Sequence, residues 1–109
     1  MGEEAALREY RRRGYSLVAQ NWRCRFGEID LVLSRAGTLV VCEVKTRRSS
    51  AMGGPHEAVT WRKQRKLRLL AEALVSELPT HPEEVRFDVA SVILDWTGDL
   101  SVHVFQQAF

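Results

Sequence analysis

The apolar and polar positions of this 109-residue chain change their period several times, and each change predicts a new element. In the N-terminal part, helical spacing gives way to extended segments separated by Gly27 and by the Ala36-Gly37 pair. The predicted elements, in chain order, are a helix at 3–13 and strands at 15–22, 28–34 and 38–46. Three strands joined by short turns predict an antiparallel meander.

A polar, glycine-rich stretch at 46–55 separates these strands from the longest helical pattern, at 57–78, which Pro79 ends. Two further strands are predicted at 85–94 and 100–105. Because a long helix between the third and fourth strands must cross over the sheet, we expect a mixed sheet. The pattern predicts one α/β domain over the whole chain, with a central mixed sheet flanked by helices in the order αβββαββ.

Two acidic residues and one lysine interrupt the most apolar segments. In the second predicted strand, alternation places one set of residues on each face: Ile29, Leu31 and Leu33 on one, and Glu28, Asp30 and Val32 on the other. In the third strand, Glu43 and Lys45 share a face and lie roughly 6.6 Å apart along the chain, at ~3.3 Å per residue. Asp30, Glu43 and Lys45 are therefore expected to crowd one site.

Two interpretations of this site are open. Charged side chains in apolar strands are usually paired or bound to a metal, so Lys45 with Glu43 or Asp30 fits a salt bridge at a sheet edge. The same residues also fit metal-assisted chemistry on a phosphate, in which Asp30, Glu43 and the Val44 carbonyl bind Mg²⁺ or Mn²⁺. In that interpretation Lys45 stabilises the transition state or orients the attacking water.

The charge is distributed unevenly along the chain. Residues 1–75 hold fifteen Lys/Arg and eight Asp/Glu, a net charge of +7, whereas residues 76–109 hold one Arg and six Asp/Glu, a net charge of −5. A basic surface around carboxylates fits a polyanionic partner, and a solvated charged face explains the charge alone equally well.

Membrane proteins and secreted proteins fit this sequence poorly. No apolar run approaches the ~20 residues that cross a bilayer, and the first residues do not form a secretion signal, so we expect a cytoplasmic protein with no membrane partner. Cys24 and Cys42 lie eighteen residues apart without a neighbouring Cys or His, which does not match a zinc site. Reduced thiols are favoured over a disulfide.

Several runs together resemble the YraN family of small bacterial proteins. They extend over nearly the whole chain in the expected order, and they are Gly2-Glu3 with Ala6, Gly14-Tyr15, Asn21-Trp22-Arg23-Cys24, Gly27-Glu28-Ile29-Asp30-Leu31-Val32, Glu43-Val44-Lys45-Thr46-Arg47, Glu57-Ala58-Val59-Thr60 with Lys63-Gln64, and Arg86-Phe87-Asp88-Val89. That family in turn is similar to the restriction-endonuclease-like PD-(D/E)XK nucleases, and in particular to archaeal Holliday junction resolvases.

The resemblance implies a role for each matching residue. Asp30 is the motif aspartate, Glu43 the second acid and Lys45 the motif lysine, while Glu3 matches the glutamate of the first helix that approaches the metal site. Ile29 stands where the motif name has proline, a departure that leaves the ligand set intact. Gln64 matches a polar residue that supports the lysine, and a plain surface glutamine fits the sequence equally well.

Cationic residues surround the expected site. Those proposed to hold phosphates without reading bases are Arg23, Arg47, Arg48, Arg62, Lys63 and Lys66, with Gln64 among them. Trp22 and Trp61 are open to two interpretations, as stacking platforms for unpaired bases or as core anchors.

The sequence thus predicts a Mg²⁺- or Mn²⁺-dependent endonuclease that acts on structured or branched DNA, with a homodimer expected by analogy with resolvases. The alternative is a nucleic-acid-binding accessory module that keeps the nuclease scaffold without cutting.

Overall fold

The structure, a computed structural model, describes residues 1–48 and 59–109. Within these ranges the elements are α1 (Gly2–Arg12), β1 (Ser16–Cys24), β2 (Gly27–Arg35), β3 (Thr38–Arg48), α2 (Trp61–Glu77), β4 (Glu84–Leu94) and β5 (Leu100–Phe105). The predicted order αβββαββ is confirmed. Most of the glycine-rich stretch at 46–55, the expected helix start at 57 and the family residues Glu57 and Ala58 lie outside the described residues.

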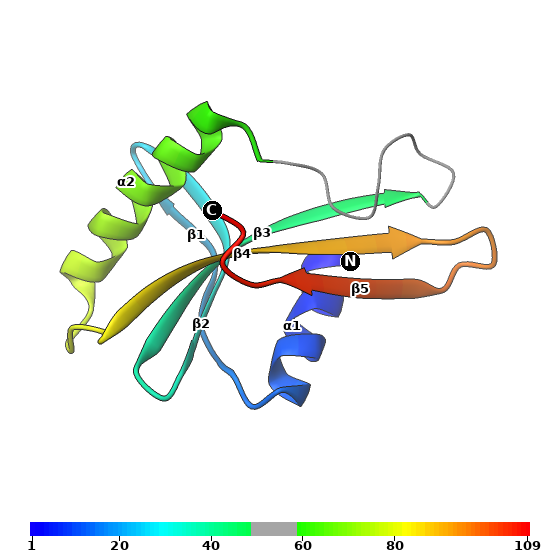
Figure 1. Ribbon diagram of the computed structural model, residues 1–109, viewed down its shortest axis with the longest axis horizontal. Helices are drawn as coiled ribbons and strands as arrows, with labels where there is room; N and C mark the ends of the chain where they lie inside the picture. The colour runs from blue at the N-terminus through cyan, green and yellow to red at the C-terminus, as the bar shows by residue number, and fades with distance from the viewer. Residues whose placement is uncertain (49–58) are drawn as a thin grey trace.

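The five strands form one mixed sheet in the order β1-β2-β3-β4-β5. Neighbouring strands are antiparallel except β3 and β4, which are parallel because α2 carries the chain back across the sheet. Figure 1 shows α1 on one side of the sheet and α2 on the other. The α/β prediction with a mixed sheet between helices is therefore confirmed.

Each helix covers its own apolar cluster. Beneath α1, Tyr10 packs on Leu31, Leu33 and Val40, while beneath α2, Leu67 and Leu70 pack on Val32 and Val41. Both faces of the central strands are thus buried, which explains the nearly continuous apolar runs in β2 and β3.

The alternation along β2 departs from the prediction at Ile29. This residue was expected to share a face with Leu31, but it packs in the cluster beneath α2. The pairs Gln20↔Leu31 and Trp22↔Ile29 place Asn21 opposite Asp30, and Asn21 has a φ of 52°. The left-handed backbone of Asn21 interrupts the pleat at this point, so strict alternation does not continue through Asp30.

The start of α2 also differs from the pattern. The helix begins at Trp61, not near residue 57, because Thr60 is an extended N-cap whose hydroxyl accepts a hydrogen bond of 3.2 Å from the Lys63 amide. The helical spacing in the sequence continues to the N-terminal side of Thr60, so spacing alone does not locate the start of the helix. The Thr60 cap fixes that start. The end before Pro79 is as predicted, since Leu78 is already extended.

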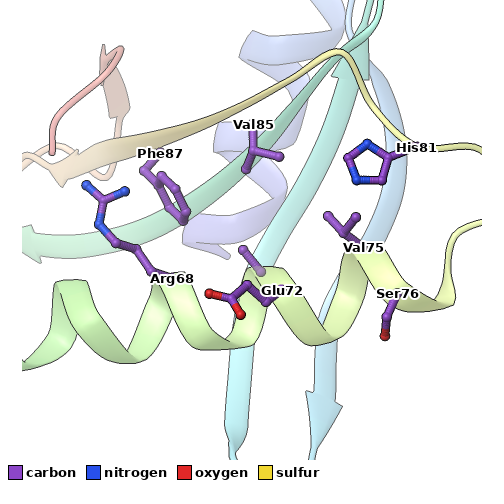
Figure 2. Close-up of a pocket in the computed structure, with 8 residues that line it drawn as sticks. Arg68, Glu72, Val75, Ser76, His81, Val85 and Phe87 are labelled. Carbon is purple, nitrogen blue, oxygen red and sulfur yellow. The ribbon is translucent and has the colours of Figure 1, made fainter.

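A groove runs along the C-terminal half of α2 (Figure 2). It has a volume of about 590 Å³, and its lining is largely apolar, with the aliphatic and aromatic side chains of Val75, Val85 and Phe87. The Arg68 guanidinium lies 4.8 Å from the centre of the Phe87 ring. Among the described residues, the ionisable ones that line the groove are Arg68, Glu72 and His81. This lining therefore contains one carboxylate and no acidic pair.

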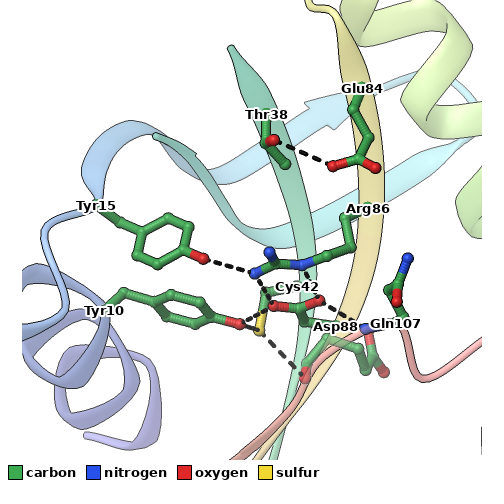
Figure 3. Close-up of polar contacts among 9 residues, drawn as sticks. Tyr10, Tyr15, Thr38, Cys42, Glu84, Arg86, Asp88 and Gln107 are labelled. Carbon is green, nitrogen blue, oxygen red and sulfur yellow. Dashed lines mark hydrogen bonds and ion pairs between the residues drawn. The ribbon is translucent and has the colours of Figure 1, made fainter. Parts of the chain in front are cut away.

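A buried polar network joins α1 to β4 on the opposite face (Figure 3). The fully buried Asp88 accepts hydrogen bonds from the Tyr10 hydroxyl at 2.7 Å, from two Arg86 nitrogens at 2.9 Å each, and from the backbone amide of Gln107 at 3.2 Å. Arg86 also donates to the Tyr15 hydroxyl at 2.9 Å. Both charges are fully partnered, so the network stabilises the fold and leaves no group available for chemistry.

Two simpler expectations concern the thiols and the membrane. Cys24 and Cys42 are both free, and burial raises the pKa of the Cys42 thiol. Neither helix within residues 1–48 and 59–109 is long and apolar enough to cross a membrane.

We predict that Asp88→Asn lowers the free energy of unfolding by about 3–5 kcal/mol, because the Arg86 guanidinium is left buried without its counter-charge. Urea unfolding followed by circular dichroism measures this change. Asp99→Asn, at an exposed turn between β4 and β5, is the matched control and should stay within about 0.5 kcal/mol of the parent. Equal stability of the Asp88 and Asp99 variants would contradict the assignment.

Candidate active site where β2 leaves β3

The candidate site lies where two neighbouring strands part. The pairing of β2 with β3 ends at Leu31↔Cys42, although β2 begins at Gly27 and β3 continues to Arg48. Beyond this point β2 pairs with β1 alone, and β3 pairs with β4 as far as Arg48↔Leu94. Figure 1 shows β3, β4 and β5 running on together while β1 and β2 turn away. The edge of β3 facing this gap is left without a strand partner from β2.

Asp30 fills part of the gap with its side chain. Its Oδ2 accepts a hydrogen bond of 2.9 Å from the Val44 amide, a donor that a continued ladder would have paired with β2 backbone. In a strand, the amide and carbonyl of one residue point to the same side. The Val44 carbonyl therefore also faces the gap, beside the Asp30 carboxylate.

Glu43 lies next to this bond on β3, on the face covered by α2. Its Oε2 is 3.6 Å from the Lys63 ammonium, and its side chain is only 13% exposed. Among the described residues, Lys63 is the cation that pairs with this largely buried carboxylate. Lys63 was predicted as a phosphate-binding residue, and its position over Glu43 also brings it to the edge of the site.

Lys45 follows Glu43 on the same face of β3 and is half-buried. In the described part of the chain it makes no salt bridge with Asp30 or Glu43; the cation that pairs with Glu43 there is Lys63. The simple salt-bridge interpretation of Lys45 is therefore not the arrangement found. Within the described residues, the Lys45 ammonium has no ion-pair partner.

The electrostatics of Asp30 reflect this crowding. Burial raises the pKa of Asp30 above its ordinary value, and the negative charge of Glu43 adds to the rise. The Val44 amide and the Lys63 ammonium oppose it. The charges of Asp30 and Glu43 thus act on each other, as is expected of carboxylates on neighbouring strands.

Glu3 is placed near this region without joining it. Gly2 packs so closely on Thr46 of β3 that a Cβ atom at Gly2 would overlap the Thr46 hydroxyl, so the start of α1 lies against the distal half of β3. Within the described residues, Glu3 makes no hydrogen bond or ion pair with Asp30, Glu43 or Lys45. With Glu4 it places negative charge on the first helical turn, which stabilises α1.

Gln64 has a structural partner. Its side-chain amide donates a hydrogen bond of 2.9 Å to the Val59 carbonyl, directly before α2 begins. The residue therefore anchors the chain entering the helix, and no hydrogen bond joins it to Lys45 among the residues described. This local cap was not recognisable from the sequence, because any polar residue near a helix start is consistent with several partners.

The remaining predicted cations are distributed over three elements. Arg47 alternates with Glu43 and Lys45 and so shares their face of β3, whereas Arg48 points to the opposite face. Arg23 is exposed and lies 3.7 Å from Glu28 across the β1–β2 hairpin. Arg62 and Lys66 are exposed on α2.

The first turn of α2 carries charge of the wrong sign for helix stability. It contains Arg62 and Lys63 and no acidic residue, and cations near the positive end of a helix are unfavourable by about 0.3–1 kcal/mol each. An anion bound near this end would reverse that penalty. Within the described residues, the Lys63 charge of this turn is balanced in part by its ion pair with Glu43.

The two tryptophans left open by the sequence have different environments. Trp22 packs against the cluster beneath α2, as a core anchor does, whereas Trp61 is 71% exposed.

Comparison with known proteins bears on the identity of this arrangement. Residues 2–92 match the group described as Uncharacterised protein family UPF0102. The chain belongs to this family. It is the YraN family that the sequence motifs predict, so that prediction is confirmed.

UPF0102 proteins similar to this chain come from different bacteria. A UPF0102 protein of Clavibacter michiganensis subsp. michiganensis is 48% identical over 107 residues, covering 98% of this chain and 91% of that protein. The Nocardia farcinica protein is 46% identical over 93 residues, covering 85% and 73%, and the Caldicellulosiruptor saccharolyticus protein is 38% identical over 109 residues, covering 99% and 92%. These names state no activity, so the chemistry must be argued from the residues of the UPF0102 site.

We predict that Asp30→Ala in the UPF0102 chain exposes the Val44 amide, whereas Asp30→Asn keeps it bonded, because the Asn side-chain carbonyl has the same shape and accepts the same hydrogen bond. Hydrogen exchange of the Val44 amide, followed by NMR, should accelerate by at least tenfold in the alanine variant and change little in the asparagine variant. Exchange that is equal in parent and Asp30→Ala would show that Asp30 does not complete the β3 edge.

Proposed function

We propose that this UPF0102 protein is a metal-dependent endonuclease of the restriction-endonuclease-like fold, which hydrolyses phosphodiester bonds in structured or branched DNA. The observation that carries the proposal is the meeting of Asp30, Glu43 and the Val44 carbonyl at one gap in the sheet, with Lys45 unpaired beside them among the described residues. A group of oxygen donors with a neighbouring ammonium fits the reaction of a phosphate better than a structural ion pair.

The donor set fits Mg²⁺ or Mn²⁺. The proposed ligands are the carboxylates of Asp30 and Glu43 and the carbonyl of Val44, all of them oxygen donors. Mg²⁺ typically takes one or two carboxylates and completes its shell with water and substrate phosphate. Bound at this gap, such a cation would neutralise charge on the phosphate and lower the pKa of a nearby water.

Each residue of the chain has a distinct part in this proposal. Asp30 and Glu43 would hold the cation, and the Val44 amide holds the Oδ2 atom of the Asp30 carboxylate at the gap. Lys45 would donate hydrogen bonds to a phosphate oxygen or orient the attacking water as the phosphate gains charge. Glu3, at the start of α1, is the more distant predicted member, and its part in catalysis is proposed by resemblance only.

Binding of the DNA backbone is assigned to the cations around the gap. Lys63 and Arg62 lie on the first turn of α2, and Arg47 shares the face of Glu43 and Lys45. Arg23, Arg48 and Lys66 are further out, where they would contact more distant phosphates. Such contacts position a duplex or a strand without reading its sequence. A cytoplasmic location and a homodimer that cuts two strands remain part of the proposal.

We predict that the purified protein cleaves branched DNA in Mn²⁺ or Mg²⁺, and that Asp30→Asn, Glu43→Gln and Lys45→Ala each slow cleavage by at least 100-fold, as expected when one group that stabilises the transition state is removed. Labelled four-way junctions, flaps and blunt duplexes, separated on denaturing gels, measure the rates. Glu72→Gln, an exposed acid further along α2, is the control and should cleave as the parent does.

Two results would contradict the nuclease proposal. Equal cleavage by the parent and all three site variants would show that the activity resides elsewhere. Tight binding of branched DNA with no cleavage in either metal would instead support the accessory module that binds nucleic acid without cutting.

A further inference from the structure

We infer that the exposed face formed by the β1–β2 hairpin tip and the outer side of α2 binds an unpaired DNA strand, so that the substrate of the neighbouring site carries a single-stranded segment. This inference rests on the proposed nuclease function for its meaning in catalysis, while the binding that it predicts is measurable on its own. The face, called here the tip–helix face, is lined by Phe26, Trp61, Arg62, Arg65, Lys66 and Leu69.

The tip–helix face is a shallow depression made by two elements. Residues 61, 65 and 69 follow one another at four-residue intervals along one side of α2, and residues 62 and 66 lie beside them. The hairpin brings Phe26 alongside, because Gly27 lies so near the helix that an added Cβ would be 3.0 Å from the Lys66 side chain. The depression has a volume of about 490 Å³.

Three large apolar side chains are left open to water on this face. Phe26 is 56% exposed, Leu69 63% and Trp61 71%. A single exposed apolar residue needs no explanation, but three that line one depression indicate a surface that binds something. Trp61 and Phe26 also have exposed aromatic rings, which favours a flat ligand.

The charged residues of the tip–helix face all have the same sign. Arg62, Arg65 and Lys66 line it without an acidic side chain, and Arg25 lies with its guanidinium 4.8 Å from the centre of the Phe26 ring. An apolar protein segment that covered this face would bury cations without partners, which is costly. A ligand that combines flat apolar groups with regularly spaced negative charges satisfies both features, and an unpaired nucleotide strand has both.

The tip–helix face and the candidate site share one helix turn. Trp61 lies two residues before Lys63, whose ammonium approaches Glu43, and the hairpin that carries Phe26 is the continuation of the strand that carries Asp30. A strand whose bases stack on Trp61 and Phe26 would therefore contact positions two and four residues along the chain from Lys63 and Asp30. In a duplex the ring faces of the bases are stacked on one another, so this contact selects unpaired ends, flaps or junction openings.

The test measures base stacking separately from charge. A fluorescein-labelled ten-nucleotide oligo(dT) and an abasic strand of the same length and charge are titrated with the full chain in EDTA, and binding is followed by fluorescence anisotropy. The parent should bind oligo(dT) at least fivefold more tightly than the abasic strand. This ratio corresponds to the lower end of the binding free energy of one base–aromatic stack. Trp61→Ala with Phe26→Ala should abolish this preference, and Trp61→Phe should restore part of it.

Trp96→Ala is the matched control, because Trp96 is 92% exposed on the turn between β4 and β5, which Figure 1 shows at the far end of the molecule from α2. It should bind both strands as the parent does. Circular dichroism checks that each variant is folded.

The outcomes separate this inference from the nuclease proposal. Equal affinity of the parent for oligo(dT) and the abasic strand, or an unchanged preference in the Trp61 and Phe26 double variant, would overturn the inference even if the protein cleaves DNA. A preference that depends on Trp61, found in a protein that cleaves no strand in Mn²⁺, would support the inference and defeat the nuclease proposal.

Discussion

The site depends on the hydrogen bond from the Val44 amide to the Asp30 carboxylate. This bond lets residues 27–30 of β2 lie apart from β3, before the pairing starts at Leu31↔Cys42, without leaving the Val44 amide unbonded in the partly buried gap. The same divergence turns the Val44 carbonyl toward Asp30 and leaves Glu43 and Lys45 on a part of β3 that β2 no longer borders. One side chain therefore completes the local fold and brings the oxygen donors together.

Asp88 and Asp30, two acids set into the sheet, have different surroundings. Asp88 is fully buried and receives four hydrogen bonds, two of them from the arginine that balances its charge. Among the described residues, Asp30 accepts one hydrogen bond, from the Val44 amide, and its pKa is raised by burial and by the neighbouring Glu43. The first acid is satisfied by the protein itself, whereas the second would be stabilised by a cation bound beside it, as the proposed function requires.

The sequence predicts most of the fold because the periods of its apolar residues are unambiguous. The alternation in β3 placed Glu43 and Lys45 on one face, and the helical pattern at 57–78 located α2, whose buried side carries Leu67, Leu70 and Leu74. The departure at Ile29 was not predictable from alternation, because it depends on the positive φ of Asn21 on the paired strand. Asn tolerates this conformation, so its place in the Asn21-Trp22-Arg23-Cys24 run was the available signal.

The placement of Asp30 and Glu43 on neighbouring strands was predictable, but the pairings of their side chains were not. The spacing of Asp30 and Glu43 identified two carboxylates on neighbouring strands, yet it could not show that Lys63, rather than Lys45, lies over Glu43. That pairing depends on where α2 begins, which the Thr60 cap decides. Similarly, the Arg86-Phe87-Asp88-Val89 run matched the family without revealing its role, since Tyr10 and Arg86 meet at Asp88 only in the folded chain.

The central claim is that Asp30 and Glu43 hold one divalent cation between them. A crystal structure with Mn²⁺, examined by anomalous scattering at the manganese edge, tests it most directly. The account predicts a manganese peak in the gap between β2 and β3, with oxygens of both carboxylates at about 2.0–2.2 Å, close to the distances of hard octahedral cations. A peak bound by other residues, or carboxylates that remain unliganded at saturating Mn²⁺, would contradict it.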